Sequence, residues 1–210
     1  NEDSYEYANR WQIENLIKKY SDHIAYPIYL EYDQTHYEDE KDEEGNAKKT
    51  IEHKREKINS SSALWRRAKS DITDEEYKSF YKNNYYDSDD PLFYIHTKAE
   101  GATEYTTLFY IPAKAPMDMN YADYKPGVKL YVKRVYITDD DKTLLPTYLR
   151  FVRGIIDSED LPLNVSREIL QENRVMTAIR NGSVKKLLSE FKKISEGNPE
   201  LYEKFIKEYN

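Results

Sequence analysis

The 210-residue sequence contains no cysteine, which excludes a disulfide framework, a thiolate zinc site and a cysteine nucleophile. It also lacks any apolar run near the roughly 20 residues that span a bilayer, and no signal peptide is visible. A chain without cysteine fits a reducing compartment. We therefore expect a cytoplasmic protein that makes no membrane contact.

Motifs that carry common reactions are missing as well. There is no P-loop, no GxGxxG and no GxSxG. The histidines occur singly, without the HxxxH or histidine–carboxylate spacing of a metal site; they are His23, His36, His53 and His96. We expect no metal site and no reaction carried out by this chain alone.

The charge balance limits the class of partner. Lys and Arg number 32 against 39 Asp and Glu, a net charge of −7, which argues against a general nucleic-acid binder. The sequence also starts without methionine and stops inside a helix-like segment. We expect it to be a piece of a longer protein.

The first third of the chain predicts a helix followed by a hairpin. Apolar residues recur with helical spacing in residues 5–20. Residues 25–58 then form two β-rich runs around a charged, acidic tip at Gly45-Asn46, which indicates a hairpin. A second helix is predicted after Thr73, because Thr73 and Glu76 have the spacing of a capping box.

The remaining segments predict a mixed α/β fold. Strands are expected over residues 92–99, 105–111 and 128–138, and a helix over residues 139–156, whose apolar face would hold Leu145, Tyr148, Leu149 and Val152. Residues 166–210 are helical in pattern, with interruptions at Asn181-Gly182 and at residues 197–199.

Residues 161–171, LPLNVSREILQ, pose an electrostatic question. Asn164 and Ser166 are favourable helix N-caps, so the following apolar pattern places Arg167 in the first turn of a helix. The helix dipole is positive there, and a cation at this position lowers the stability of the helix by a few tenths to about 1 kcal/mol.

Two interpretations of Arg167 remain open. In the structural one, the guanidinium pairs with a preceding carboxylate, which is Asp157, Glu159 or Asp160. In the chemical one, an arginine beside unpaired helix N–H groups binds a phosphate, with Asn164 and Gln171 within reach of it.

A longer stretch around this motif resembles a known family. Residues 129–171, which include DSEDLPLNVSRE, closely resemble the middle domain of the ninety-kilodalton heat-shock chaperones, nearest to the bacterial HtpG-type members. Residues 18–28, 64–82 and 90–119 are also similar to the family. The resemblance covers nearly the whole chain, and its DSEDLPLNVSRE block is highly specific.

The resemblance implies a domain plan. The family is a dimeric, ATP-driven stress-response chaperone with a nucleotide-binding domain, a middle domain and a dimerisation domain. Residues 1–58 would be the last helix and hairpin of the nucleotide-binding domain. Residues 59–160 would be the large α/β part of the middle domain, a three-layer α-β-α sandwich, and residues 161–210 the helical coil after it.

The resemblance also implies catalytic roles. Arg167 would reach the γ-phosphate of ATP, held with Mg²⁺ on the nucleotide-binding domain, and neutralise charge on the transferring phosphoryl oxygens. Gln171 and Asn164 would orient the same loop, and Arg134 would support it. The ATP pocket is outside this sequence, so we expect no cofactor on the chain alone.

Client contact is the second implied function. Trp65 and a loop with Met117, Met119 and Tyr121 resemble client-binding positions of the family. The alternatives are that Trp65 packs against the following helix and that the methionines anchor their loop. Implied partners are the chain's own nucleotide-binding domain, unfolded or partly folded clients, and a second copy of the full-length protein. A pure docking module, with Arg167 as a local ion pair, is the alternative function.

Overall fold

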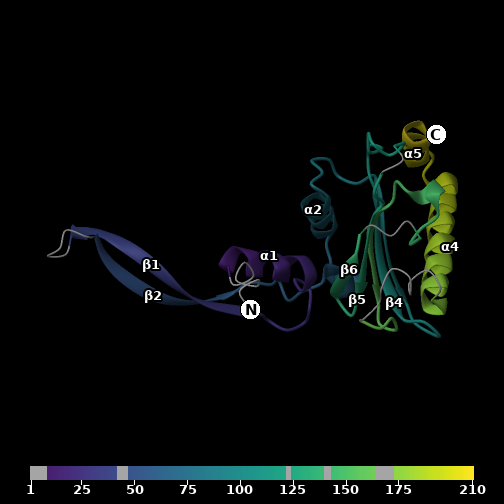
Figure 1. Ribbon diagram of the computed structural model, residues 1–210. Helices are drawn as coiled ribbons and strands as arrows, with labels where there is room; N and C mark the ends of the chain where they lie inside the picture. The colour runs from purple at the N-terminus through teal and green to yellow at the C-terminus, as the bar shows by residue number, and fades with distance from the viewer. Residues whose placement is uncertain (1–8, 42–46, 122–123, 140–142, 164–172) are drawn as a thin grey trace. The chain divides into compact units, whose positions relative to one another are not determined.

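The computed structural model describes residues 9–41, 47–121, 124–139, 143–163 and 173–210. The chain divides into two compact units, Asn1–Ser62 and Ala63–Asn210 (Figure 1).

The first unit contains the predicted helix and hairpin. Helix α1 (Arg10–Tyr20) begins at Asn9, whose side chain accepts a hydrogen bond from the Trp11 backbone N–H at 2.9 Å. Strands β1 (Tyr29–Lys41) and β2 (Ala47–Lys57) pair antiparallel. Both predictions are confirmed over the described residues, although β1 begins at Tyr29 rather than at residue 25.

The late start of β1 has a local cause in Asn59. This side chain is buried, accepts a hydrogen bond from the Ile28 N–H at 2.8 Å and donates to the Tyr26 carbonyl at 2.9 Å. Pro27, between them, has no N–H to donate. The Ile28 N–H and the Tyr26 carbonyl are therefore bound to Asn59 and are not available to extend the pairing of β1 with β2.

The second unit is built on a sheet that has five strands in the described part of the chain, in the order β3-β4-β7-β5-β6. These strands are β3 (Phe93–Ala99), β4 (Tyr105–Ile111), β5 (Gly127–Val132), β6 (Val135–Thr138) and β7 (Arg153–Ser158). Strand β5 runs parallel to β7, and the other neighbouring pairs are antiparallel. The central strands β4 and β7 are buried along almost their whole length.

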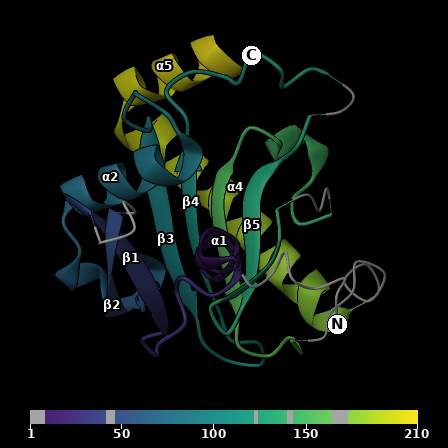
Figure 2. The ribbon, with the colours of Figure 1, turned by 60° about the vertical axis from the view of Figure 1, so that its left-hand side comes forward.

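Helices cover both faces of this sheet, as Figures 1 and 2 show for α2 on one side and α4 on the other. Helices α4 (Arg174–Gly197) and α5 (Pro199–Tyr209) pack on the face that carries Phe109 and Ile111. The opposite face packs against α2 (Asp74–Tyr85) and the 3-10 turn η2 (Leu64–Arg66). The fold is the three-layer α-β-α sandwich that was expected.

One predicted strand is two strands. Residues 128–138 form β5 and β6, which reverse direction at Lys133 and Arg134. Both turn residues have positive φ, 51° and 67°. Neither glycine nor asparagine stands at this turn, so the residue pattern does not predict the hairpin.

The predicted helix over residues 139–156 is wrong. Of these, residues 143–156 contain the 3-10 turn η4 (Thr147–Leu149) and the start of β7. Leu145, Leu149 and Val152 are buried as expected, but Tyr148 is exposed. Buried parallel strands are apolar on both faces, so a short run such as RGIIDS cannot be distinguished from helix by periodicity.

The helix boundaries follow their capping residues. Thr73 and Glu76 form the predicted capping box of α2. The interruption at residues 197–199 separates α4 from α5, with Asn198 as the α5 cap. The one expected at Asn181-Gly182 does not occur, because α4 continues through it.

Candidate functional site

A buried carboxylate organises the carboxyl end of β7. Asp157 is fully buried; its Oδ2 accepts the indole N–H of Trp65 at 2.8 Å, and its Oδ1 accepts the backbone N–H of Arg134 at 3.1 Å. Burial raises the pKa of the Asp157 carboxyl, and these two hydrogen bonds oppose the rise. The carboxylate thus joins three separate segments at one point, which we call the β7 corner.

Trp65 is the packing centre of that corner. Its side chain is 1% exposed and contacts Tyr131, with ring centroids 5.0 Å apart, and Phe80 of α2, at 5.9 Å. Its carbonyl accepts the Nε2–H of His96 at 2.9 Å. The structure therefore places Trp65 against the following helix, with almost none of its side chain exposed.

The β5–β6 turn contributes backbone donors to the corner. The backbone N–H of Lys133 donates to the Ser158 carbonyl at 3.0 Å, while that of Arg134 binds Asp157. Two successive residues with positive φ are typical of a type I′ turn, for which Asn-Gly is preferred. Lys133 and Arg134 adopt this conformation at a cost, which suggests that their side chains serve a purpose.

The segment after β7 is held by short polar contacts. The Ser158 hydroxyl oxygen accepts the N–H groups of Asp160 and Leu161, both at 3.2 Å. Glu159 forms an ion pair with Arg66 at 2.5 Å, and Asp160 accepts the Glu104 N–H at 2.7 Å. Leu161 then enters the core.

The predicted catalytic residues follow this anchored segment. Asn164, Arg167 and Gln171 lie outside the described residues. The chain is described again from Asn173, whose side chain caps α4 by accepting the N–H groups of Val175 and Met176. A core leucine and a helix cap therefore hold the two sides of the predicted loop.

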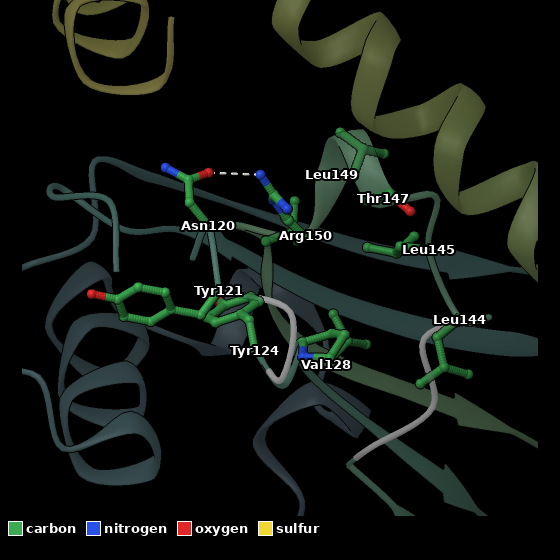
Figure 3. A pocket seen from close by; sticks show the side chains of 11 residues that line it. Asn120, Tyr121, Tyr124, Val128, Leu144, Leu145, Thr147, Leu149 and Arg150 are labelled. Carbon is green, nitrogen blue, oxygen red and sulfur yellow. Dashed lines mark hydrogen bonds between the residues drawn. The ribbon is translucent and has the colours of Figure 1, made fainter. Parts of the chain in front are cut away.

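The loop predicted to contact clients borders a pocket on the other side of the unit. Met117 is 100% exposed and Tyr121 67% exposed, whereas Met119 is half-buried against the core. Beside them is a cavity of about 250 Å³, which we call the loop pocket (Figure 3). Its lining comprises Asn120, Tyr121, Tyr124, Pro126, Val128, Leu144, Leu145, Thr147, Leu149, Arg150 and Val152.

The histidines have individual partners within their own units. Within the described ranges, no group of three or more histidine or acidic residues is placed to hold a metal ion. His96 is buried between Tyr77 and the Trp65 carbonyl, and His53 pairs with Asp33 across the hairpin at 2.8 Å. No helix in the described residues is long and apolar enough to cross a membrane.

Two features of the site escaped sequence reasoning. The first is the bond between Asp157 and Trp65, which are 92 positions apart. The residue pattern suggests Asp157 only as a partner for Arg167. The loop pocket combines residues from β5, η4 and the preceding loop. A correct β7 assignment from the apolar run before Asp157 would have placed that carboxylate at a strand end.

Three comparisons bear on this geometry. The family model described as "Hsp90 protein" matches residues 6–57 and 31–210. Among curated proteins, Chaperone protein HtpG of Treponema denticola is 62% identical over 100% of this chain and 32% of its own length. That of Aliarcobacter butzleri is 58% identical over 99% of this chain and 33% of its own. The chain spans about a third of these relatives.

A solved structure shares the fold. The middle domain of a putative heat shock protein from Plasmodium falciparum is 31% identical, with a TM-score of 0.60 over 70% of this chain and 55% of the other.

Proposed function

We propose, because this chain belongs to the Hsp90 family, that it is the middle segment of an ATP-driven chaperone. In this proposal residues 1–58 complete the nucleotide-binding domain. Arg167 reaches the γ-phosphate of ATP bound there with Mg²⁺, and neutralises charge that develops during transfer. Asn164 and Gln171 orient the loop that carries it.

The main support for the proposal comes from three carboxylates. In the structural alternative, Arg167 would form an ion pair with one of them. Asp157 accepts two hydrogen bonds, Glu159 pairs with Arg66, and Asp160 accepts a backbone N–H. Each of the three thus has a partner other than Arg167. Because Asp157 is fully buried and already accepts two donors, we assign Arg167 to an external anion rather than to that carboxylate.

The strained turn at the β7 corner supports the same proposal. Among the described residues, no carboxylate lies within ion-pair distance of the Lys133 or Arg134 side chain. Two cations held beside the segment that leads to Arg167 raise the local positive potential. Arg134 would therefore assist phosphate binding without touching the reacting atoms.

Steady-state ATP turnover by the full-length protein tests the proposal. Arg167→Ala should lower turnover on the order of 100-fold or more, as for other groups that stabilise a transferring phosphoryl, while ATP affinity and folding are retained. Arg180→Ala, in α4, is the matched control and should leave turnover unchanged. Unchanged turnover in Arg167→Ala would favour the docking module.

The isolated chain gives a second test. It lacks the nucleotide pocket, so calorimetry should detect no micromolar ATP binding and no hydrolysis. Micromolar binding of ATP by the 210-residue chain would contradict the domain assignment.

The second part of the proposal is a client surface on the loop with Met117 and Tyr121. Exposed methionine and tyrosine adapt to varied apolar partners. Replacing Met117 and Tyr121 together by serine should weaken suppression of client aggregation by the full-length protein without changing its ATP turnover. Family membership alone supports the further proposals of a homodimer and a cytoplasmic location.

A further inference from the structure

The loop pocket has a floor and a mouth of different chemistry. Its floor is made of core aliphatic side chains, which are Val128, Leu144, Leu145, Leu149 and Val152. Asn120 and Arg150 lie together at one side of the lining, and the Tyr121 hydroxyl points away from the aliphatic residues (Figure 3). A ligand that fills it must be apolar at one end and polar at the other.

The size of the pocket limits that apolar end. Its volume is about 250 Å³. An apolar cavity of about 150 Å³ accommodates benzene, whereas drug-sized ligands and cofactors use roughly 300–1,000 Å³. The pocket therefore suits one bulky side chain, such as phenylalanine or leucine, rather than a cofactor.

The positive charge of Arg150 at the mouth of the pocket favours a ligand whose polar end is negatively charged. The Nη2 of Arg150 donates to the Oδ1 of Asn120 at 2.7 Å. Over the described residues no carboxylate forms an ion pair with Arg150, and Asp118 on the same loop is exposed and does not reach it. A guanidinium has five N–H donors, so most of them remain available to an anion.

We infer that the loop pocket binds a segment of an unfolded client through one bulky apolar side chain, with an adjacent carboxylate on Arg150. The exposed Tyr121, which lines the pocket, and the exposed Met117, four positions earlier on the same loop, would contact neighbouring residues of the same segment. This inference rests on the proposed client-binding function and specifies its preferred sequence, which is an apolar residue next to Asp or Glu.

Blocked dipeptides test the inference with the 210-residue chain labelled at its Leu and Val methyl groups. Acetyl-Phe-Asp-amide should shift the methyl signals of Leu144, Leu149 and Val152 in a saturable way. Acetyl-Phe-Asn-amide should bind about three- to tenfold more weakly, because it lacks the charge-assisted bond to a partly exposed arginine. Acetyl-Ala-Asp-amide should cause no shift at these methyl groups.

Variants of Arg150 separate charge from shape. Arg150→Gln keeps a donor for Asn120 and should abolish the preference for the Asp peptide over the Asn peptide. Arg150→Lys should restore part of that preference, and Arg180→Gln, away from the pocket, should leave it unchanged. Absence of saturable shifts with acetyl-Phe-Asp-amide, or equal affinity for the two phenylalanine peptides, would overturn the inference.

An aggregation assay with client proteins distinguishes failure of this inference from failure of the proposed client function. Suppression of aggregation by the full-length protein should fall in Arg150→Gln for clients rich in apolar–acidic pairs. If suppression is unaffected by Arg150→Gln but lost in the Met117 and Tyr121 serine variant, the inference fails while the proposed client function stands. If neither set of changes affects suppression, the client function on this loop fails as well.

Discussion

The indole N–H of Trp65 donates a hydrogen bond of 2.8 Å to the Asp157 carboxylate, 92 residues later in the sequence. This bond fastens the η2 turn to the end of β7, just before the segment that leads to Arg167. Because the carboxylate is fully buried, each donor that it accepts is needed to stabilise its charge. Trp65, which resembles a client-binding position of the family, thus holds the η2 turn to the buried carboxylate near the end of β7.

Trp65→Phe should reveal the strength of this bond. The ring keeps much of its packing on Tyr131 and Phe80, but Asp157 loses one donor, which should cost about 1.5–3 kcal/mol of the free energy of unfolding at pH 7.5. Burial raises the pKa of Asp157 in the folded state. Protonation of the carboxyl on acidification removes the buried charge, so the difference from wild type should shrink as pH falls.

Urea unfolding at pH 7.5 and at about pH 5 measures both effects. Comparing the variant with wild type at each pH cancels contributions from other groups, such as His96. A loss of unfolding free energy that stays equal at still lower pH, throughout the titration of the folded-state Asp157 carboxyl, would mean that the indole acts through volume alone.

Local rules predicted the elements whose sequence carries its own signals. The capping box at Thr73 and Glu76 defined α2, and the two β-rich runs on either side of EGATE (residues 100–104) indicated β3 and β4. The local rules failed at β7, because a strand that is buried on both faces does not alternate apolar and polar residues. They also failed at Lys133-Arg134, because lysine and arginine are unfavourable in the positive-φ conformation of this turn. The Asp157 contacts and the loop pocket depend on tertiary pairing, which no local pattern encodes.

Replacing the turn residues should separate stability from function. Lys133→Asn combined with Arg134→Gly supplies the preferred type I′ sequence, and both backbone N–H bonds are retained. We expect about 1–2 kcal/mol greater unfolding free energy but lower ATP turnover in the full-length protein. Greater stability with unchanged turnover would remove the functional reason for the strained turn; Arg134→Ala should lower turnover without the gain in stability.

His96 should make the second unit sensitive to acid. Its Nε2–H donates to the Trp65 carbonyl, so Nδ1 accepts from the Tyr77 hydroxyl at 2.7 Å, and burial lowers the pKa of His96 below 6.5. A lowered folded-state pKa gives stability that is present above pH 6.5 and is lost as the pH falls through the folded-state value.

The urea midpoint between pH 7.5 and 5 tests this expectation. His96→Gln retains a donor toward Trp65 and should flatten the acid decline, at some cost in stability at pH 7.5. His53→Gln is the control: the hydrogen bond to Asp33 raises the pKa of that exposed histidine, so its own contribution has the opposite sign. An acid decline that persists unchanged in His96→Gln would exclude His96 as its cause.

Gly182 explains why α4 passes through a sequence that predicts an interruption. A Cβ atom at this position would collide with the hydroxyl oxygen of Tyr105, whereas it would lie 3.4 Å from Cζ, an ordinary contact. The glycine therefore makes room for Tyr105 against the helix, at the expense of about 1 kcal/mol of helix propensity relative to alanine.

A double-mutant cycle isolates this contact. Gly182→Ala alone should lower the unfolding free energy, because the Tyr105 ring is partly buried against the core and must shift its hydroxyl to admit the Cβ atom. In a Tyr105→Phe background the same change should be neutral or stabilising by up to about 1 kcal/mol, an interaction of roughly 1–3 kcal/mol between the two sites. Gly197→Ala is the control, since a Cβ there meets nothing within 4 Å. If Gly182→Ala instead lowers the unfolding free energy equally in both backgrounds, the Tyr105 hydroxyl is not the reason for glycine at position 182, and backbone packing of α4 on the sheet must be.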